Sequence, residues 1–534
     1  MKKIYPLLLL LLLNAFAKSQ YVQKVTSINY YGFNGLNPSE LTVFNNKLFF
    51  LGTDDPHYVN KLMYTDGTEA GVTVVKQIDT IQQYPSLAHL TVVNGRLVFN
   101  NSSQLWQSDG TAGGTSAIAH IRVLYPAMAV LGTHAFFSGD TGTSGYPHDQ
   151  LWMTDGTQAG TTLVKTINPT GAAGIANMFT FNGNVYFAAN DGVNNTQLWI
   201  SDGTGAGTKL LKTIDPAGSY PSSFIAYNGK VYFTASDAVN GSQLWVTDGT
   251  TPGTMALTNA NVAHYGMFPA AFTLYNSKLY FCAVDSMSFY QLWETDGTSG
   301  GTKTVYTNYT PRNGTNGFYP GSMAVHNNML FMSGFDTITG HDQLWISDGT
   351  GAGTTRVTNY ANGLFPGSLF SFQNRVIMIG YDSVSQQSQL FASDGTAEGT
   401  VCPTPPDTWG QYPFYPFQRW VRYNGAVYYR AAYAYFADYQ LCRYSELPMG
   451  LTEQHLQHLT IYPNPTTGSF NITLPATINN ATIDVYNSIG ALVHHQSTSN
   501  TLNHVDLTGS PDGLYIITLR SNNQVIGTQK IIKQ

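Results

Sequence analysis

Residues 197–208 read Gln-Leu-Trp-Ile-Ser-Asp-Gly-Thr-Gly-Ala-Gly-Thr, and the chain repeats this pattern with small changes. The Asp-Gly-Thr copies begin at Asp66, Asp109, Asp155, Asp202, Asp248, Asp296, Asp348 and Asp394. Neighbouring copies lie between 43 and 52 residues apart. A period of this length is typical of propeller blades, in which each unit supplies one small sheet and must stack on its neighbours to bury its faces.

Each repeat also carries the signature of a hairpin upstream of the Gln-Leu-Trp segment. Two apolar runs flank a pair of turn residues that tolerate positive φ. The pairs include Asn45-Asn46, Asn94-Gly95, Asn182-Gly183, Asn228-Gly229, Asn276-Ser277, Asn327-Asn328 and Asn424-Gly425. We therefore expect four strands per unit, A to D. Strand C carries Gln-Leu-Trp, and strand D follows Gly-Thr, as in residues 161–167 and 208–214.

The number of units predicts how the ring closes. Nine units have strands A, B and C, but the ninth, which contains Gln440-Leu441-Cys442, has no recognisable strand D. Residues 22–28 resemble a strand D that no unit precedes. We expect the N-terminal segment to complete the last blade, because this pairing removes two open edges. Eight blades stay possible if residues 419–444 form a cap.

The repeat resembles the ELWxxDGT repeat family of exported bacterial proteins, and its turn is similar to the Asp-box of sialidase propellers. The resemblance covers residues 61–400 and implies a repeat architecture at the cell surface, without an established chemistry. We interpret the eight aspartates as structural turn residues, since an Asp carboxylate accepts hydrogen bonds from the following backbone. The alternative is Ca²⁺ binding, for which one carboxylate per turn is a poor ligand set.

Six tryptophans share the position after Gln-Leu, which predicts packing between blades. They are Trp106, Trp152, Trp199, Trp245, Trp293 and Trp345; the alternative role is stacking on sugars. Cys442 takes this position in the last unit and is expected to be a packed apolar residue. The three cysteines do not form a disulfide framework, and a pairing of Cys402 with Cys442 is left open.

The B–C and D–A loops should share one face and vary most, so we place any specific function there. An aromatic residue followed by Pro often precedes strand A, and with Trp409 these residues are the candidate ligand-binding set: Tyr84, Tyr125, Tyr220, Phe268, Tyr319, Phe365, Trp409 and Tyr412. An acidic residue often ends strand B: Asp55, Asp140, Asp191, Asp237, Asp285, Asp336 and Asp382. The alternative is that both sets only shape the loops.

No sequence motif of catalysis is evident, and neither a metal site nor a cofactor is indicated. A glycosidase built from converging loop acids stays an alternative. Only 10% of the residues are charged and the net charge is −6, so a nucleic-acid partner is not expected. Residues 1–19 resemble a signal peptide, with Lys2 and Lys3 before the apolar run 7–13. No transmembrane helix is expected after its cleavage.

The C-terminal segment differs from the repeat. Residues 461–470 read Ile-Tyr-Pro-Asn-Pro-Thr-Thr-Gly-Ser-Phe, and Gln529-Lys530-Ile531-Ile532-Lys533 lies near the end. This segment resembles the type A C-terminal sorting domain of the type IX secretion system. The resemblance assigns the sorting motif to Tyr462, Pro463, Asn464, Pro465, Gly468 and Lys530. It implies a small immunoglobulin-like β-sandwich and passage through the periplasm to the outer surface, with the secretion machinery and possible surface lipopolysaccharide as partners.

The predicted organisation is a signal peptide at 1–19, a propeller at 20–443, a linker at 444–458 and a sorting domain at 459–534. We expect an all-β protein that is secreted or held at the cell surface, where its propeller acts as a binding or adhesion scaffold for a glycan or a protein. The alternatives are a glycan-processing hydrolase or lyase with loop carboxylates at the channel mouth, and a purely structural surface component.

Overall fold

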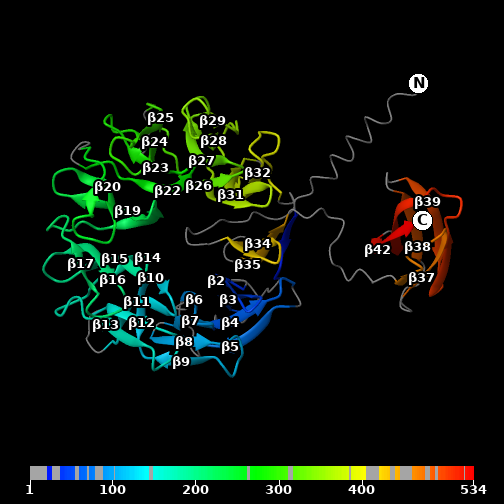
Figure 1. Cartoon of the computed structure of the whole chain (residues 1–534), viewed down its shortest axis with the longest axis horizontal. Coiled ribbons are helices and arrows are strands. Elements are labelled where there is room, and N and C mark those ends of the chain that lie inside the picture. The colour runs from blue at the N-terminus through cyan, green and yellow to red at the C-terminus, as the bar shows by residue number, and fades with distance from the viewer. Residues whose placement is uncertain are drawn as a thin grey trace. The chain divides into compact units, whose positions relative to one another are not determined.

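The computed structural model describes residues 21–26, 36–53, 59–68, 71–78, 88–101, 103–142, 148–260, 265–310, 317–383, 386–403, 420–432, 439–445, 460–474, 481–487, 491–521 and 524–534. These residues contain strands and turns and no helix. The chain divides into two compact units, residues 20–446 and a second unit that includes residues 447–534. The larger unit is a ring of small antiparallel sheets around an open centre (Figure 1).

Nine sheets make up the described part of this ring, and we number them as blades in chain order. Blade 1 has β2 (Ser39–Phe44), β3 (Lys47–Gly52), β4 (Lys61–Thr65) and β5 (Thr73–Gln77). Blade 2 has β6 (Ala88–Val93), β7 (Arg96–Asn101), β8 (Gln104–Ser108) and β9 (Ser116–Ala119). Blade 3 has β10 (Arg122–Leu131), β11 (His134–Asp140), β12 (Gln150–Thr154) and β13 (Thr162–Lys165).

The next three blades follow the same order. Blade 4 has β14 (Ala176–Phe181), β15 (Asn184–Asn190), β16 (Thr196–Ser201) and β17 (Lys209–Lys212). Blade 5 has β18 (Ser222–Tyr227), β19 (Lys230–Asp237), β20 (Gly241–Thr247) and β21 (Met255–Ala256). Blade 6 has β22 (Ala270–Tyr275), β23 (Lys278–Val284), β24 (Tyr290–Thr295) and β25 (Lys303–Tyr306).

The last three blades contain the departures from the pattern. Blade 7 has β26 (Met323–His326), β27 (Met329–Asp336), β28 (His341–Ser347) and β29 (Thr355–Arg356). Blade 8 has β30 (Gly367–Phe372), β31 (Arg375–Asp382) and β32 (Gln387–Ser393). Blade 9 has β33 (Val421–Tyr423), β34 (Ala426–Ala432), β35 (Tyr439–Ser445) and, from the N-terminus, β1 (Tyr21–Lys24).

The predicted A–B turns adopt the left-handed backbone that their residues tolerate. Asn228 and Gly229, for example, have φ angles of 47° and 71°. Between such turns and the next loop, strand B is buried along most of its length, as in β15. A buried aromatic and aliphatic strand is what the second apolar run of each repeat predicts.

Strand D is shorter than expected. The sequence predicted residues 161–167 and 208–214, but β13 ends at Lys165 and β17 ends at Lys212. The cause is a buried Gln side chain on strand C. In blade 3 the Oε1 of Gln150 accepts the N–H of Ile167, and in blade 4 the Oε1 of Gln197 accepts the N–H of Ile214. The side chain thus takes the place of the backbone hydrogen bond that would continue the strand.

Blade 8 has no regular strand D among the described residues. After Thr400 a single antiparallel bridge joins Ala392 to Val401, and both of its hydrogen bonds are 2.9 Å long. The expectation of four strands in this unit is therefore wrong for residues 401–403. Pro403 has no N–H to donate and cannot continue the ladder.

The N-terminal segment completes blade 9, as the sequence predicted. Strand β1 pairs with β35 from Tyr21↔Ser445 to Lys24↔Cys442. Strand β35 runs through Ser445, two residues beyond the predicted end of the propeller at Arg443. Tyr444 belongs to the sheet because its side chain is buried against Phe372 of blade 8. The rest of the predicted linker, from 446 on, lies outside the described residues.

The residue at the tryptophan position of the repeat packs on the preceding blade in every unit. Each of the six tryptophans joins a hydrophobic cluster shared with the blade before it. Phe391 and the buried Cys442 do the same in blades 8 and 9. Met63 of blade 1 packs with Tyr428 of blade 9, so the packing continues around the ring. All three cysteines are free thiols.

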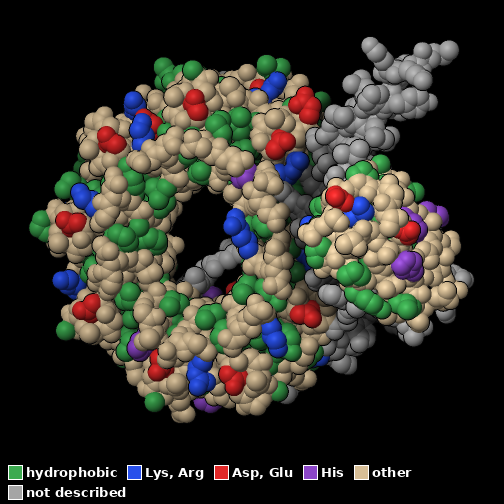
Figure 2. All heavy atoms as spheres, turned by 45° about the vertical axis from the view of Figure 1, so that its right-hand side comes forward, with side chains coloured by type: hydrophobic (Ala, Val, Ile, Leu, Met, Phe, Trp, Pro, Cys, Tyr) green, Lys and Arg blue, Asp and Glu red, His purple; other side chains and the backbone are tan. Residues whose placement is uncertain are grey.

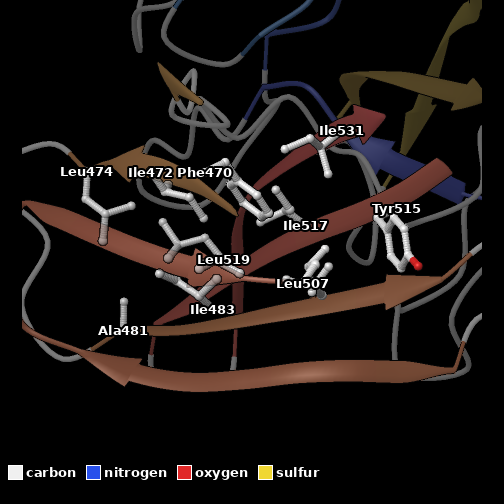
Figure 3. Packing of buried hydrophobic residues seen from close by; sticks show 12 residues of the cluster. Phe470, Ile472, Leu474, Ala481, Ile483, Leu507, Tyr515, Ile517, Leu519 and Ile531 are labelled. Carbon is white, nitrogen blue, oxygen red and sulfur yellow. The ribbon is translucent and has the colours of Figure 1, made fainter. Parts of the chain in front are cut away.

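The second unit is a β-sandwich. One sheet contains β36 (Thr460–Tyr462), β37 (Ser469–Thr473) and β40 (Leu502–Asp506). The other has the order β39 (Leu492–Thr498), β38 (Ala481–Asn487), β41 (Gly513–Ser521) and β42 (Gln524–Lys533). Side chains from both sheets, such as Phe470 and Ile517, point toward one another and form the core (Figure 3).

Candidate functional site

The Asp-Gly-Thr turns share one hydrogen-bond pattern. In blade 5, Asp248 Oδ1 accepts the N–H of Thr250 at 2.9 Å and the hydroxyl of Thr250 at 2.7 Å. The Thr250 hydroxyl oxygen in turn accepts the N–H of Gly253 at 3.0 Å. The same contacts recur at Asp66, Asp109, Asp155, Asp202, Asp296, Asp348 and Asp394. The aspartates therefore make the contacts that a turn-stabilising role requires.

These hydrogen bonds also set the charge of the turn. Donation from the Thr250 hydroxyl and then from its N–H holds the pKa of Asp248 below its ordinary value. The pKa of Asp202 is lowered in the same way by the N–H and hydroxyl of Thr204. A lowered pKa keeps these carboxylates ionised, since the ionised form accepts both bonds.

The two glycines of the turn have different roles. A Cβ on the second glycine, such as Gly253, would overlap the Asp248 carboxylate. In most turns the first glycine lies against an aromatic ring of the preceding blade: Gly297, at a φ of 94°, faces Tyr232, and Gly67 faces Tyr428 across the junction of blades 9 and 1. Gly156 of blade 3 instead faces Arg96. The turn is thus a contact between blades as well as a reversal of the chain.

The leading Gln of the repeat anchors the loops of the opposite face, a role that the sequence did not reveal. Gln243 is fully buried, and its Nε2 donates to the carbonyls of Asn240 and Ala260, each at 2.8 Å. Its Oε1 accepts the hydroxyl of Thr258 at 2.8 Å. The side chain therefore both donates and accepts, which a carboxylate cannot do.

We define the loop face as the described B–C and D–A loops of blades 4 to 8. The predicted acids at the ends of strand B cap these loops. Asp191 Oδ1 accepts the N–H groups of Val193 and Asn194. Asp336 Oδ2 accepts the N–H of Thr339 and forms an ion pair with Arg356 at 2.5 Å. Outside this face Asp140 pairs with Arg122, and Asp55 lies outside the described residues.

Four of the predicted aromatic residues lie on the loop face, in four successive blades. They are Tyr220, Phe268, Tyr319 and Phe365, with exposed fractions from 38% to 63%. All four have a φ of 48° or 49°. A bulky residue rarely adopts this conformation, and such strain is found most often at functional sites. Tyr84, Trp409 and Tyr412 lie outside the described residues, as does the side chain of Tyr125.

Exposed apolar side chains gather on the loop face rather than on the turns opposite. Among the described loops and turns of the propeller, ten large hydrophobic residues are exposed, and all ten lie here. They are Val193, Tyr220, Val239, Tyr265, Phe268, Met287, Tyr309, Tyr319, Ile338 and Phe365. Exposed apolar side chains that share one face of a protein are typical of a binding site.

The loop face contains no Lys or Arg among its described residues. Charged side chains of both signs are spread over the visible surface of the ring, without a large patch of one sign (Figure 2). The described residues also hold no group of three His, Cys, Asp or Glu arranged for a metal ion. They include no helix with the length and apolar character needed to cross a membrane.

The sorting motif forms hydrogen bonds with β42, the C-terminal strand of the sandwich. Asn464 Nδ2 donates to the carbonyl of Lys530 at 3.0 Å, and Asn464 Oδ1 accepts the N–H of Ile532 at 3.1 Å. Thr466 continues this contact, since its N–H donates to the carbonyl of Ile532 at 2.8 Å. A Cβ on Gly468 would overlap the Thr508 side chain. The exposed Tyr462-Pro463-Asn464-Pro465 segment therefore lies directly beside β42.

Comparison with known proteins yields matches of different extent. Residues 460–534 match the family model described as a secretion system C-terminal sorting domain. An ulvan lyase of Nonlabens ulvanivorans is 31% identical over 85 residues, which is 16% of each chain. The chain thus spans a small part of the length of this curated relative.

Solved structures of low similarity cover more of the chain. A puromycin-hydrolyzing peptidase of Mycobacterium tuberculosis has 12% identity and a TM-score of 0.37, over 75% of this chain and 60% of that one. PorZ, a surface component of the type IX secretion system of Porphyromonas gingivalis, has 11% identity and a TM-score of 0.22, over 93% and 86% of the two chains. Scores this low carry no conclusion about activity.

The sorting domain indicates how the protein is exported. Its strands, its core and the motif at β42 belong to one folded unit, and the family match covers that unit from residue 460 on. Residues 460–534 are a type IX secretion C-terminal sorting domain, and the protein that carries them is exported through the periplasm to the cell surface or the extracellular space.

Proposed function

We propose that this exported protein is a binding or adhesion scaffold, and that its loop face holds a glycan or protein ligand. The observation that carries the proposal is the gathering of the ten exposed apolar residues on this face. Side-chain caps and buried Gln anchors hold the loops beneath them, as Asp191 and Gln243 illustrate. Rigid loops lose little conformational entropy when they bind, which favours affinity.

The repetition of the site favours a ligand that itself repeats. Tyr220, Phe268, Tyr319 and Phe365 occupy equivalent positions in successive blades. A glycan chain offers one sugar after another to such a row, and apolar faces of sugars can stack on the aromatic rings.

The test is binding of the purified full chain to an array of neutral and anionic polysaccharides. The combined variant Tyr220→Ala, Phe268→Ala, Tyr319→Ala, Phe365→Ala should lose at least about tenfold in affinity, since each buried aromatic contact is worth about 1 kcal/mol or more. The matched control is Val74→Ala, Leu163→Ala, Met255→Ala, which removes exposed apolar groups from outer strands and should bind normally. Equal binding by all three proteins would contradict the proposal.

The second candidate is a glycan-processing hydrolase or lyase, and the local likeness to an ulvan lyase favours it. The loop acids that this candidate would use are engaged in this structure: Asp237 accepts the N–H groups of Val239 and Asn240, and Asp285 accepts those of Met287 and Phe289. Release of soluble products from any polysaccharide on the array, lost on replacing one loop acid by its amide, would support this candidate over the first.

A further inference from the structure

The sorting domain exposes a set of apolar side chains on the outer face of its four-stranded sheet. Leu492, Leu514, Ile516 and Ile532 have exposed fractions of 52%, 41%, 40% and 45%. They alternate along the strands with core residues such as Tyr515, Ile517 and Ile531, which point to the opposite side. The outer position of these residues therefore follows from the strand period and does not result from a local distortion.

These side chains form one continuous patch across the sheet. The register pairs Tyr486 with Leu492 on one side and with Ile516 on the other. Strand β42 continues the row, because Ile516 pairs with Lys530 and Leu514 pairs with Ile532. Paired residues on one face of adjacent strands lie about 4.5–5.5 Å apart. We call this set of six residues on four strands the outer patch.

The outer patch adjoins the sorting motif. Asn464 holds the backbone of Lys530 and Ile532, whose side chains belong to the patch. The exposed prolines on both sides of Asn464 therefore flank the edge of the same sheet. A sorting domain must be recognised by its secretion machinery, and protein interfaces have an apolar centre with a polar rim.

We infer that the outer patch, together with the adjoining motif segment, is the surface that the type IX secretion machinery contacts. The partner is a protein surface with an apolar centre that covers Leu514, Ile516 and Ile532. The exposed Lys530 lies at the margin of the patch, where it favours an acidic group on the partner.

The experiment measures export of the full chain in a bacterium with an active type IX system. The variants are Leu514→Thr/Ile516→Thr, which keeps strand-forming residues, and Ile532→Lys, which adds a charge to the patch. Immunoblots should show at least a tenfold loss from the surface and the medium, with accumulation in the periplasm. The matched control is Leu502→Thr, because Leu502 is 53% exposed on β40 of the other sheet. This control should be exported normally.

Two further measurements separate recognition from folding. Thermal melts of the purified full-length variants should match the wild type, and the apolar variant Leu514→Met/Ile516→Val should be exported. Export of both patch variants at the wild-type level would overturn the inference. So would equal retention of the Leu502→Thr control, or retention of the apolar variant, since either result would show that the machinery responds to something other than this patch.

Discussion

At the scale of single residues, the ring depends on side chains that both donate and accept hydrogen bonds. The buried Gln at the start of the repeat motif in blades 3 to 9 is the clearest case. Gln343 donates from Nε2 to the carbonyl of Tyr360 at 2.7 Å, and its Oε1 accepts the hydroxyl of Thr358 at 2.8 Å. Because both partners belong to a loop that lies 15 to 17 residues further along the chain, this side chain determines where the loop begins.

Replacing this Gln by Glu should destabilise the propeller. In Gln243→Glu or Gln343→Glu, a carboxylate would face carbonyl oxygens that need a donor, at a cost of about 1–3 kcal/mol. The measurement is the free energy of unfolding in urea at pH 7. The control is Gln158→Glu, at an exposed position in a C–D turn, which should change stability by less than about 0.5 kcal/mol. Equal stability of all variants would contradict the assigned role.

The lowered pKa of the turn aspartates predicts a loss of stability in acid. A folded pKa below the unfolded value of about 3.9 means that the contribution is fully present above that pH and is lost as the pH falls through the folded pKa. Thermal midpoints should therefore decline below about pH 4. The triple variant Asp202→Asn, Asp248→Asn, Asp296→Asn keeps the acceptor oxygens without the charge. Its decline should be shallower, and an identical pH profile would refute the explanation.

At the scale of elements, the N-terminal strand reproduces the strand D of other blades. Thr26 donates its hydroxyl to Gln440 Oε1 at 2.7 Å and accepts the N–H of Leu441 at 3.0 Å. Thr258 makes the same two contacts with Gln243 and Leu244, at 2.8 and 3.0 Å. A segment more than 400 residues distant thus completes blade 9 with the geometry of blade 5.

This equivalence can be tested with matched substitutions. Thr26→Val and Thr258→Val each remove one hydroxyl and leave a buried N–H and an amide oxygen without that partner, so each should cost about 1–3 kcal/mol. The measurement is unfolding of the full chain in urea. If Thr26→Val were neutral while Thr258→Val destabilised, the terminal strand would not contribute to the stability of blade 9.

The sequence predicted the existence of these strands better than the residues at which they end. Asn-Gly turns and alternating apolar runs determine a hairpin locally, so strands A and B could be placed from their own residues. The early end of strand D could not, because it depends on a Gln side chain from the neighbouring strand. The loop-face aromatic residues were predicted by position, but their shared left-handed backbone is a property of the folded loop.

At the scale of the whole molecule, each unit has its own core. The sandwich cluster contains only residues from Phe470 to Ile531 with Ile461 packed against it, and the nine propeller clusters lie between successive blades. A large fold built by local stacking gains stability with each interface, so the propeller does not need the second unit to bury its surface.

Removal of the sorting domain should therefore separate folding from export. A chain that ends at Glu446 keeps all the described strands of the ring. It should melt within about 2 °C of the propeller transition of the full chain and should keep any binding at the loop face. In a bacterium with a type IX system it should remain in the periplasm, because residues 460–534 carry the sorting domain. The full chain with the four loop-face substitutions is the reciprocal control: it should be exported and should not bind. Export of the truncated chain, or loss of its propeller transition, would show that the two units do not divide recognition and sorting in this way.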